Sequence, residues 1–134
     1  MNLCYLGVGA NLGDRRKNII LAVKKINQLP DTRIVKAAKI IETKPLGGPK
    51  TQTKFLNTVL KIKTKLKPRV LLRGLKKIER ELGRKKTPQR YGPRPIDLDI
   101  LFYADRIVNT RELVIPHPKI FQRGFVLGPL SELL

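Results

Sequence analysis

Hydrophobic and polar positions follow two different periods along this chain, and together they predict strands and helices. Apolar or alternating runs predict strands over 3–8, 34–41, 55–66 and 96–103. Apolar residues at three- and four-residue spacing predict one helix after Asp14 and a second from Pro68 to Leu82. A further short strand is expected at 107–108, and a final helix, interrupted by Pro129, is expected over 125–134.

Residue types at the ends of the two helices support these predictions. Asp14 is suited to cap the first helix, and Pro30 with Asp31 stops it. Pro68 suits the first turn of the second helix, and Gly83 ends it. The predicted buried stripes are Ile19, Ile20, Val23 and Ile26 in the first helix and Val70, Leu71, Leu75, Ile78 and Leu82 in the second.

The order strand-helix-strand-strand-helix-strand predicts an α+β fold. We expect a ferredoxin-like split βαβ sheet packed with helices in three α/β/α layers. Residues 42–54 are rich in proline and glycine, and residues 84–95 are basic with three prolines, so both segments are predicted to be loops.

Length and composition exclude several classes of protein. With 134 residues, the chain is expected to form a single domain spanning 1–134. A hydrophobic content of 41% excludes a disordered chain, and one cysteine excludes a disulfide-rich secreted scaffold. No apolar run is long enough to span a membrane, and the first residues lack a signal-peptide pattern, so a cytoplasmic location is expected.

A formal net charge of +19 predicts a polyanionic partner: nucleic acid, anionic lipid or a phosphate-rich small molecule. Residues 61–94 hold 14 of the 29 basic residues and only two acidic ones. This stretch fits either a solvated helix face with a basic loop or a polyphosphate clamp at Arg84–Arg94, and composition leaves both open.

Two aspartates provide the sharper chemical signal. Asp97 and Asp99 are two residues apart in a predicted strand, so their carboxylates point to the same face. Such a pair fits a Mg²⁺ site completed by substrate phosphates, and it equally fits an exposed strand face. The basic loop just before it, which includes Arg84, Arg90 and Arg94, favours phosphate chemistry over the second interpretation.

Three other groups carry weaker signals. His117 lies between Pro116 and Pro118 near Arg123, where it is either structural or a phosphate ligand. Phe55 and Asn57 share a strand face, and they fit either a core edge or a heterocycle site. The glycine-rich stretch 7–13 matches neither a P-loop nor a dinucleotide fingerprint.

Taken in order, these segments resemble the 6-hydroxymethyl-7,8-dihydropterin pyrophosphokinase family from residue 5 to residue 130. The stretches that carry the resemblance are 9–15, 42–47, 55–57, 90–100, 115–118 and 123–127. The resemblance implies transfer of pyrophosphate from ATP to the hydroxymethyl group of the pterin in folate biosynthesis. It also implies two Mg²⁺ ions held by Asp97 and Asp99.

The resemblance further implies a role for each matching residue. The catalytic set is Arg84, Arg94, Asp97 and Asp99. ATP is expected to contact Glu79 (near the ribose or adenine), Arg84, Tyr91, Arg94, Ile100, His117 and Arg123. The pterin is expected to contact Thr43, Pro45, Leu46, Phe55, Asn57 and Phe125, with its ring between the two phenylalanines. The loops at 42–54 and 84–95 are expected to close over both substrates and exclude water.

Two alternatives remain beside the enzyme. A basic module that only binds nucleic acid gains nothing from two carboxylates beside its basic loop, since they repel phosphates. A degenerate family member kept for binding alone is disfavoured by Asp97, Asp99, His117, Arg123 and Asn57. We therefore expect ATP and the pterin as ligands, no specific nucleic acid, no membrane partner and a monomer.

Overall fold

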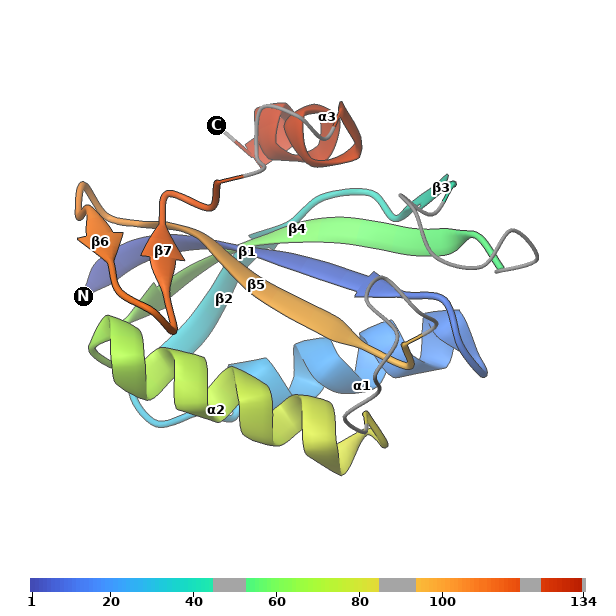
Figure 1. Ribbon diagram of the computed structural model, residues 1–134, viewed down its shortest axis with the longest axis horizontal. Coiled ribbons are helices and arrows are strands. Elements are labelled where there is room, and N and C mark those ends of the chain that lie inside the picture. The colour runs from blue at the N-terminus through green and yellow to red at the C-terminus, as the bar shows by residue number, and fades with distance from the viewer. Residues whose placement is uncertain (45–52, 85–93, 119–123, 134) are drawn as a thin grey trace.

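A five-stranded antiparallel sheet forms the centre of the molecule (Figure 1). The computed structural model describes residues 1–44, 53–84, 94–118 and 124–133, and in the last of these ranges the side chains of 128 and 130–133. The strands are β1 (Asn2–Ala10), β2 (Thr32–Ala37), β3 (Ile41–Thr43), β4 (Phe55–Thr64) and β5 (Asp97–Tyr103). Their order is β2-β4-β1-β5, with β3 also paired to β4. A small separate hairpin contains β6 (Val108–Asn109) and β7 (Val114–Ile115).

Three helices cover the sheet in the described part of the chain. Figure 1 shows α1 (Arg15–Asn27) and α2 (Pro68–Glu81) side by side on one face, and α3 (Gly124–Leu133) on the other. The predicted α+β class and the α/β/α layering are therefore confirmed. The predicted helix ends hold as well, because the Asp14 side chain accepts a hydrogen bond from the Lys17 backbone at 3.2 Å and Pro68 opens α2.

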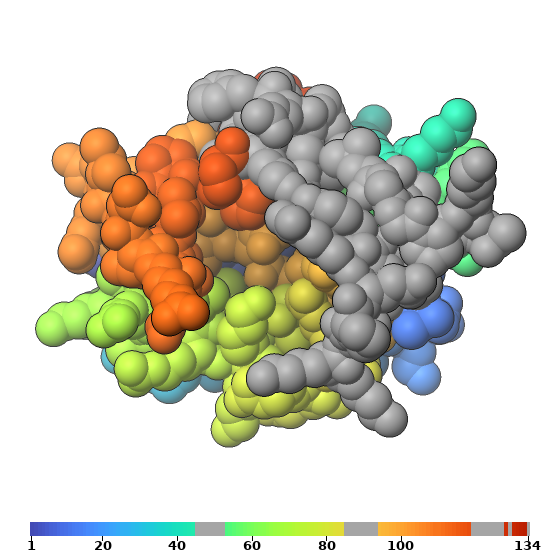
Figure 2. All heavy atoms as spheres, viewed as in Figure 1, coloured from blue at the N-terminus to red at the C-terminus, as the bar shows by residue number. Residues whose placement is uncertain are grey.

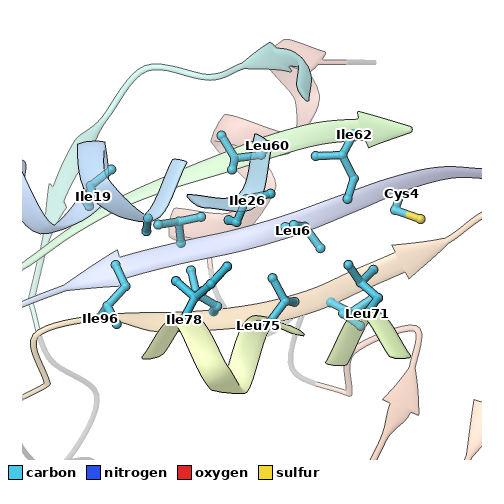
Figure 3. Packing of buried hydrophobic residues seen from close by; sticks show 14 of the residues in the cluster. Cys4, Leu6, Ile19, Ile26, Leu60, Ile62, Leu71, Leu75, Ile78 and Ile96 are labelled. Carbon is cyan, nitrogen blue, oxygen red and sulfur yellow. The ribbon is translucent and has the colours of Figure 1, made fainter. Parts of the chain in front are cut away.

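The main core lies between the sheet and the first two helices. Figure 3 shows side chains from β1, β4, α1 and α2 converging there, with Leu6, Leu60, Ile26 and Leu75 among them. A second, smaller cluster on the other face joins the sheet to α3, and it contains Ala38, Val59, Leu101, Leu130 and Leu133. The prediction that Ile20 and Val70 are buried is wrong. They are 58% and 43% exposed, because each lies on the solvent side of its helix.

The strand predicted over 34–41 and the loop predicted from 42 also need correction. The structure ends β2 at Ala37 and begins a second short strand, β3, at Ile41. Both strands pair with β4, and Ala38 stays attached between them through its backbone N–H to the Val59 carbonyl at 3.0 Å. The edge of the sheet therefore continues to Thr43, which lies inside the segment predicted to be a loop.

The basic charge is concentrated in part on the outer side of α2, away from the sheet. Its exposed cations are Arg69, Arg73, Lys76, Lys77 and Arg80. The yellow-green side chains of this helix form much of the lower surface in Figure 2. This arrangement matches the solvated helix face that the sequence allowed. None of the helices in the described residues has the length and apolarity needed to cross a membrane.

Candidate active site

The sheet face opposite α1 and α2 lines up three residues across three neighbouring strands. Asn57 of β4 lies directly opposite Gly9 of β1, and Gly9 lies directly opposite Asp97 of β5. Paired residues of antiparallel strands project to the same face, so the Asn57 and Asp97 side chains flank a position with no side chain. Asp99 projects to this face as well, two residues further along β5. Two groups of predicted site residues therefore share one surface.

The two aspartates alternate with buried residues along β5. Their side chains are 23% and 32% exposed, whereas Leu98 and Ile100 belong to the main core. Oδ1 of Asp97 accepts a hydrogen bond from Arg84 Nη1 at 2.9 Å and lies 3.5 Å from Arg94 Nη1. The structure thus brings the predicted metal-binding carboxylate into contact with two of the predicted phosphate-binding arginines.

Arg84 is placed by the way α2 ends. Gly83 has φ +95°, a left-handed conformation that glycine adopts without a side-chain clash. The Gly83 N–H donates to the Arg80 carbonyl at 3.0 Å, and the Arg84 N–H donates to the Glu79 carbonyl at 2.9 Å. This pair of bonds is a Schellman motif, and it turns the chain back over the last turn of the helix. Arg84 consequently points toward β5 and reaches Asp97.

Glu79 holds Arg84 from beneath. Its side chain is 3% exposed, and Oε2 accepts hydrogen bonds from Arg84 Nη1 at 2.5 Å and from the Leu98 backbone N–H at 2.8 Å. Lys76 Nζ lies 3.4 Å from Oε1. A buried carboxylate requires such partners, because an unpaired buried charge is costly. These contacts make Glu79 a support for Arg84 and for the outer strand, and the contact with the ribose or adenine that the resemblance implies stays a prediction.

Asn11 holds Arg94 and was missed by the sequence analysis as a site residue. It is 2% exposed, and its Oδ1 accepts the Arg94 backbone N–H at 2.7 Å. The Asn11 backbone N–H donates to the Arg94 carbonyl at 3.0 Å, and Asn11 Nδ2 donates to the Thr53 carbonyl at 3.1 Å. Asn11 therefore connects the end of β1 to the residues that precede β4 and β5. The available signal was a polar residue directly after an apolar, glycine-containing strand.

His117 approaches the second aspartate from the hairpin side. Its Nε2 lies 3.9 Å from Asp99 Oδ1, and its backbone N–H donates to the Leu101 carbonyl at 3.0 Å. Leu101 is the extra residue of a bulge in β5, where the pairing with β1 shifts by one residue. The bulge turns Leu101 toward α3, and the hydrogen bond from His117 attaches the segment after β7 to the outer strand.

A second cluster lies on the other side of Gly9. Asn57 Nδ2 donates to Thr43 Oγ1 at 2.5 Å, and Thr43 pairs with Phe55 across β3 and β4. All three side chains are partly exposed. This cluster joins an amide, a hydroxyl and an aromatic ring, which is the set that binds the edge and face of a flat heterocycle.

The remaining predicted residues fall into two groups. The side chain of Ile100 lies in the main core, on the face opposite the two aspartates, so only its backbone can contact ATP. Pro45, Leu46, Tyr91 and Arg123 lie outside the described residues, as do most of the two predicted loops. Phe125 lies in α3, and its side chain is likewise outside the description.

The donor set fits magnesium. Within the described ranges, no group of three or more histidine, cysteine, aspartate or glutamate side chains could hold a metal by itself. Mg²⁺ in phosphate-transferring sites is usually held by one or two carboxylates, with the rest of its ligands from phosphates and water. Asp97 and Asp99 supply two partly exposed carboxylates on one face, which meets that requirement.

Paired carboxylates beside arginines on the sheet face opposite α1 and α2, next to a heterocycle-binding cluster, define the class: a phosphoryl-transferring enzyme. The model of the 7,8-dihydro-6-hydroxymethylpterin-pyrophosphokinase family matches residues 5–134. The chain therefore belongs to this family, whose members transfer pyrophosphate from ATP to hydroxymethyldihydropterin in folate synthesis.

Individual relatives agree with this membership. The 2-amino-4-hydroxy-6-hydroxymethyldihydropteridine pyrophosphokinases of Bacillus subtilis and Aquifex aeolicus are 41% and 43% identical to this chain. These matches cover 98% and 99% of this chain, and 78% and 81% of the relatives. The folic acid synthesis protein fol1 of Pneumocystis carinii is 43% identical over 96% of this chain, which spans only 17% of that longer protein.

The fold also matches a solved structure. A crystal structure of HPPK-DHPS in complex with substrates superposes with a TM-score of 0.73 at 16% identity. The match covers 98% of this chain and 40% of the solved chain. At that identity the likeness supports the fold.

Proposed function

We propose that this chain transfers the pyrophosphoryl group of ATP to 6-hydroxymethyl-7,8-dihydropterin on the sheet face around Gly9. The alignment of Asn57, Gly9 and Asp97 across β4, β1 and β5 carries this proposal. Neighbouring strands lie about 4.8 Å apart, so the amide and the carboxylate stand on strands separated by roughly 10 Å. That span accommodates a bicyclic ring with its hydroxymethyl arm at one end and phosphates at the other.

The pterin occupies the side of this face formed by β3 and β4. Asn57 and Thr43 meet its polar edge, because an amide and a hydroxyl supply both donors and acceptors. Phe55 lies against one side of the ring, and by resemblance Phe125 lies against the other. Pro45 and Leu46 are assigned to the pterin by resemblance alone.

ATP occupies the side formed by β5 and the residues that follow α2. Arg84, Arg94 and His117 surround the two aspartates there and bind the phosphates. A guanidinium has five N–H donors, so each arginine can contact a carboxylate through Nη1 and a phosphate through its other donors. Arg123 and Tyr91 are assigned to ATP by resemblance, and Glu79 acts by holding Arg84.

Asp97 and Asp99 are the residues that would hold two Mg²⁺ ions. When bound, Mg²⁺ neutralises phosphate charge and helps to align the attacking and leaving oxygens. Arg84 and Arg94 keep the Asp97 carboxylate in place on the strand, and they supply positive charge at the same position. His117 lies beside the Asp99 carboxylate. The reaction therefore depends on Mg²⁺ in addition to ATP.

In the proposed reaction one P–O bond forms and one P–O bond breaks. The hydroxymethyl oxygen forms a bond to the β-phosphorus of ATP, and it loses its proton to solvent. The bond from the β-phosphorus to the α,β-bridging oxygen breaks, which releases AMP. We assign no general base among the described residues, and positioning with electrostatic stabilisation accounts for the rate.

An assay of AMP formation with ATP, Mg²⁺ and hydroxymethyldihydropterin tests the proposal. We expect AMP in amounts equal to the pterin diphosphate, and none when the pterin lacks its hydroxyl group. Removal of Mg²⁺ with a chelator should stop the reaction, and added Mg²⁺ should restore it. If AMP forms at the same rate without any pterin, the chain is an ATP hydrolase and the proposal is wrong.

A further inference from the structure

Gly9 stands beneath the heterocycle-binding cluster, where a side chain has no room. A Cβ atom built on Gly9 would lie 2.7 Å from Asn57 Oδ1 and 3.5 Å from Phe55 Cδ1. The first distance is shorter than real Cβ atoms show. Gly13 and Gly83 have positive φ, whereas Gly9 does not. Backbone conformation therefore does not require glycine at position 9. Glycine is required there because the space above it is already filled.

The group that a Cβ would displace is the amide of Asn57. Asn57 Nδ2 donates to Thr43 Oγ1 at 2.5 Å, so moving the amide weakens or breaks the link between β4 and β3 side chains. Oδ1 is the end of a short, partly exposed side chain, which can rotate away without moving the backbone. The fold can therefore accept a methyl group at position 9, while the arrangement of the cluster cannot.

We infer that Gly9 is a positioning residue for the pterin. By having no side chain, it leaves room for the Asn57 amide over β1, bonded to Thr43, where its polar atoms can meet one heterocycle edge. It also places no side chain of its own between Asn57 and Asp97, on the path from the ring to the phosphates. The substrate in this inference rests on the proposed function.

Gly7 provides a matched comparison on the same strand and face. It lies opposite Val59 and Asp99 in the sheet. A Cβ atom at Gly7 would meet the side chain of Leu101 at 3.4 Å, which is at the short end of ordinary contact with a flexible group. Replacing either glycine with alanine has the same effect on the unfolded chain, so the two variants differ chiefly in what their methyl groups touch.

The experiment compares Gly9→Ala with Gly7→Ala by calorimetric binding and thermal unfolding. We expect Gly9→Ala to weaken binding of hydroxymethyldihydropterin at least about tenfold, the usual effect of losing a hydrogen bond to a well-placed polar group. Binding of a non-hydrolysable ATP analogue should change less than about twofold, and Tm should stay within a few degrees. Gly7→Ala should bind both ligands like the parent protein.

A double-mutant cycle with Asn57→Ala identifies the route of the effect. If Gly9→Ala acts by moving Asn57, it should weaken pterin binding by less than about twofold once Asn57 is alanine. A full tenfold loss in that background would overturn the inference, because the methyl group would then act on something else. Unchanged pterin binding in Gly9→Ala alone would overturn it too.

A measurement without substrate separates this inference from the proposed function. The side-chain amide signals of Asn57 in a ¹H–¹⁵N spectrum, assigned by their loss in Asn57→Ala, should shift in Gly9→Ala and stay in place in Gly7→Ala. If the parent protein does not bind the pterin but these signals shift as expected, the positioning of Asn57 stands and the proposed substrate is wrong. If the signals do not shift, the inference itself is wrong.

Discussion

The two faces of the sheet are built from the same strands, yet they differ in cover and in composition. One face is closed by α1 and α2 over a continuous apolar cluster that includes Leu98 and Ile100. On the other, α3 packs over a smaller cluster that contains Val59 and Leu101. Beyond that cluster, the same face presents polar side chains around Gly9.

This difference shows how a single strand can serve stability and chemistry together. In β5 the side chains alternate, so Asp97 and Asp99 face the site while Leu98 and Ile100 face the core. The buried residues hold the strand in register, and the register sets where the carboxylates stand. Changes on one face should therefore alter catalysis with little effect on folding, and changes on the other should do the reverse.

The largest effect is expected from the polar face. Asp97→Ala and Asp99→Ala should each lower the rate of AMP formation by on the order of a thousandfold, because each removes a carboxylate proposed to hold Mg²⁺. Both carboxylates are partly exposed, so the folded structure should remain, as judged by circular dichroism and Tm.

Asp105→Ala is the control for this pair. Asp105 is exposed in the turn after β5, away from the site, so its replacement should leave the rate unchanged. Rates near that of the parent protein in either Asp97→Ala or Asp99→Ala would contradict the proposed metal ligands.

Substitutions on the apolar face should lower the free energy of unfolding. Leu98→Ala removes a side chain that is 1% exposed, and such changes cost about 2–5 kcal/mol of unfolding free energy through lost burial and the cavity left behind. Urea unfolding measures this loss, and Asp99→Ala serves as the neighbour on the opposite face. Equal losses of stability in the two variants would show that the faces do not divide the roles in this way.

The smallest expected effect concerns the thiol on the apolar face. Burial raises the pKa of Cys4 from 9.0 to about 12. Above pH 9 the unfolded chain releases this proton while the folded chain retains it, so stability falls as pH rises toward 12. Between pH 8 and pH 10 the loss should be about 1 kcal/mol.

Comparing the parent protein with Cys4→Ala reports this contribution together with the coupling of Cys4 to Tyr103. Burial raises the pKa of Tyr103 in both proteins, and the Cys4 charge raises it further in the parent protein alone. The difference in unfolding free energy between them should shrink from pH 8 to pH 10. A difference that stays constant over this range would mean that the thiol ionises in the folded protein as readily as in the unfolded one.

Much of the fold was predictable from local patterns. The apolar periods located both long helices and the main strands, and Asp14, Pro68 and Gly83 marked their ends because capping depends on neighbouring residues alone. Ile20 and Val70 were misplaced, since a helical stripe has a width that the period does not define. The short strand β3 was missed, because its three residues form a strand only through pairing with β4.

The candidate site was predictable in its members and less so in their contacts. The sequence located Asp97, Asp99, Arg84 and Asn57. Assigning the chain to its family depended on several ordered motifs together. The sequence did not show that Glu79 is bonded to Arg84 and Leu98, because those partners depend on how α2 packs beside β5. Nor did it show that Asn11 holds Arg94, which follows β1 by more than eighty residues.

The sequence by itself determined which residues alternate, where the helices begin and end, and which side chains carry charge, because these follow from neighbours a few positions away. Only the tertiary structure decided that Asn57, Gly9 and Asp97 stand in one row. That row depends on the register of three strands distant in sequence, and register is set by burial of their apolar faces beneath α1 and α2. Long-range packing therefore makes a site from residues that local patterns only identify.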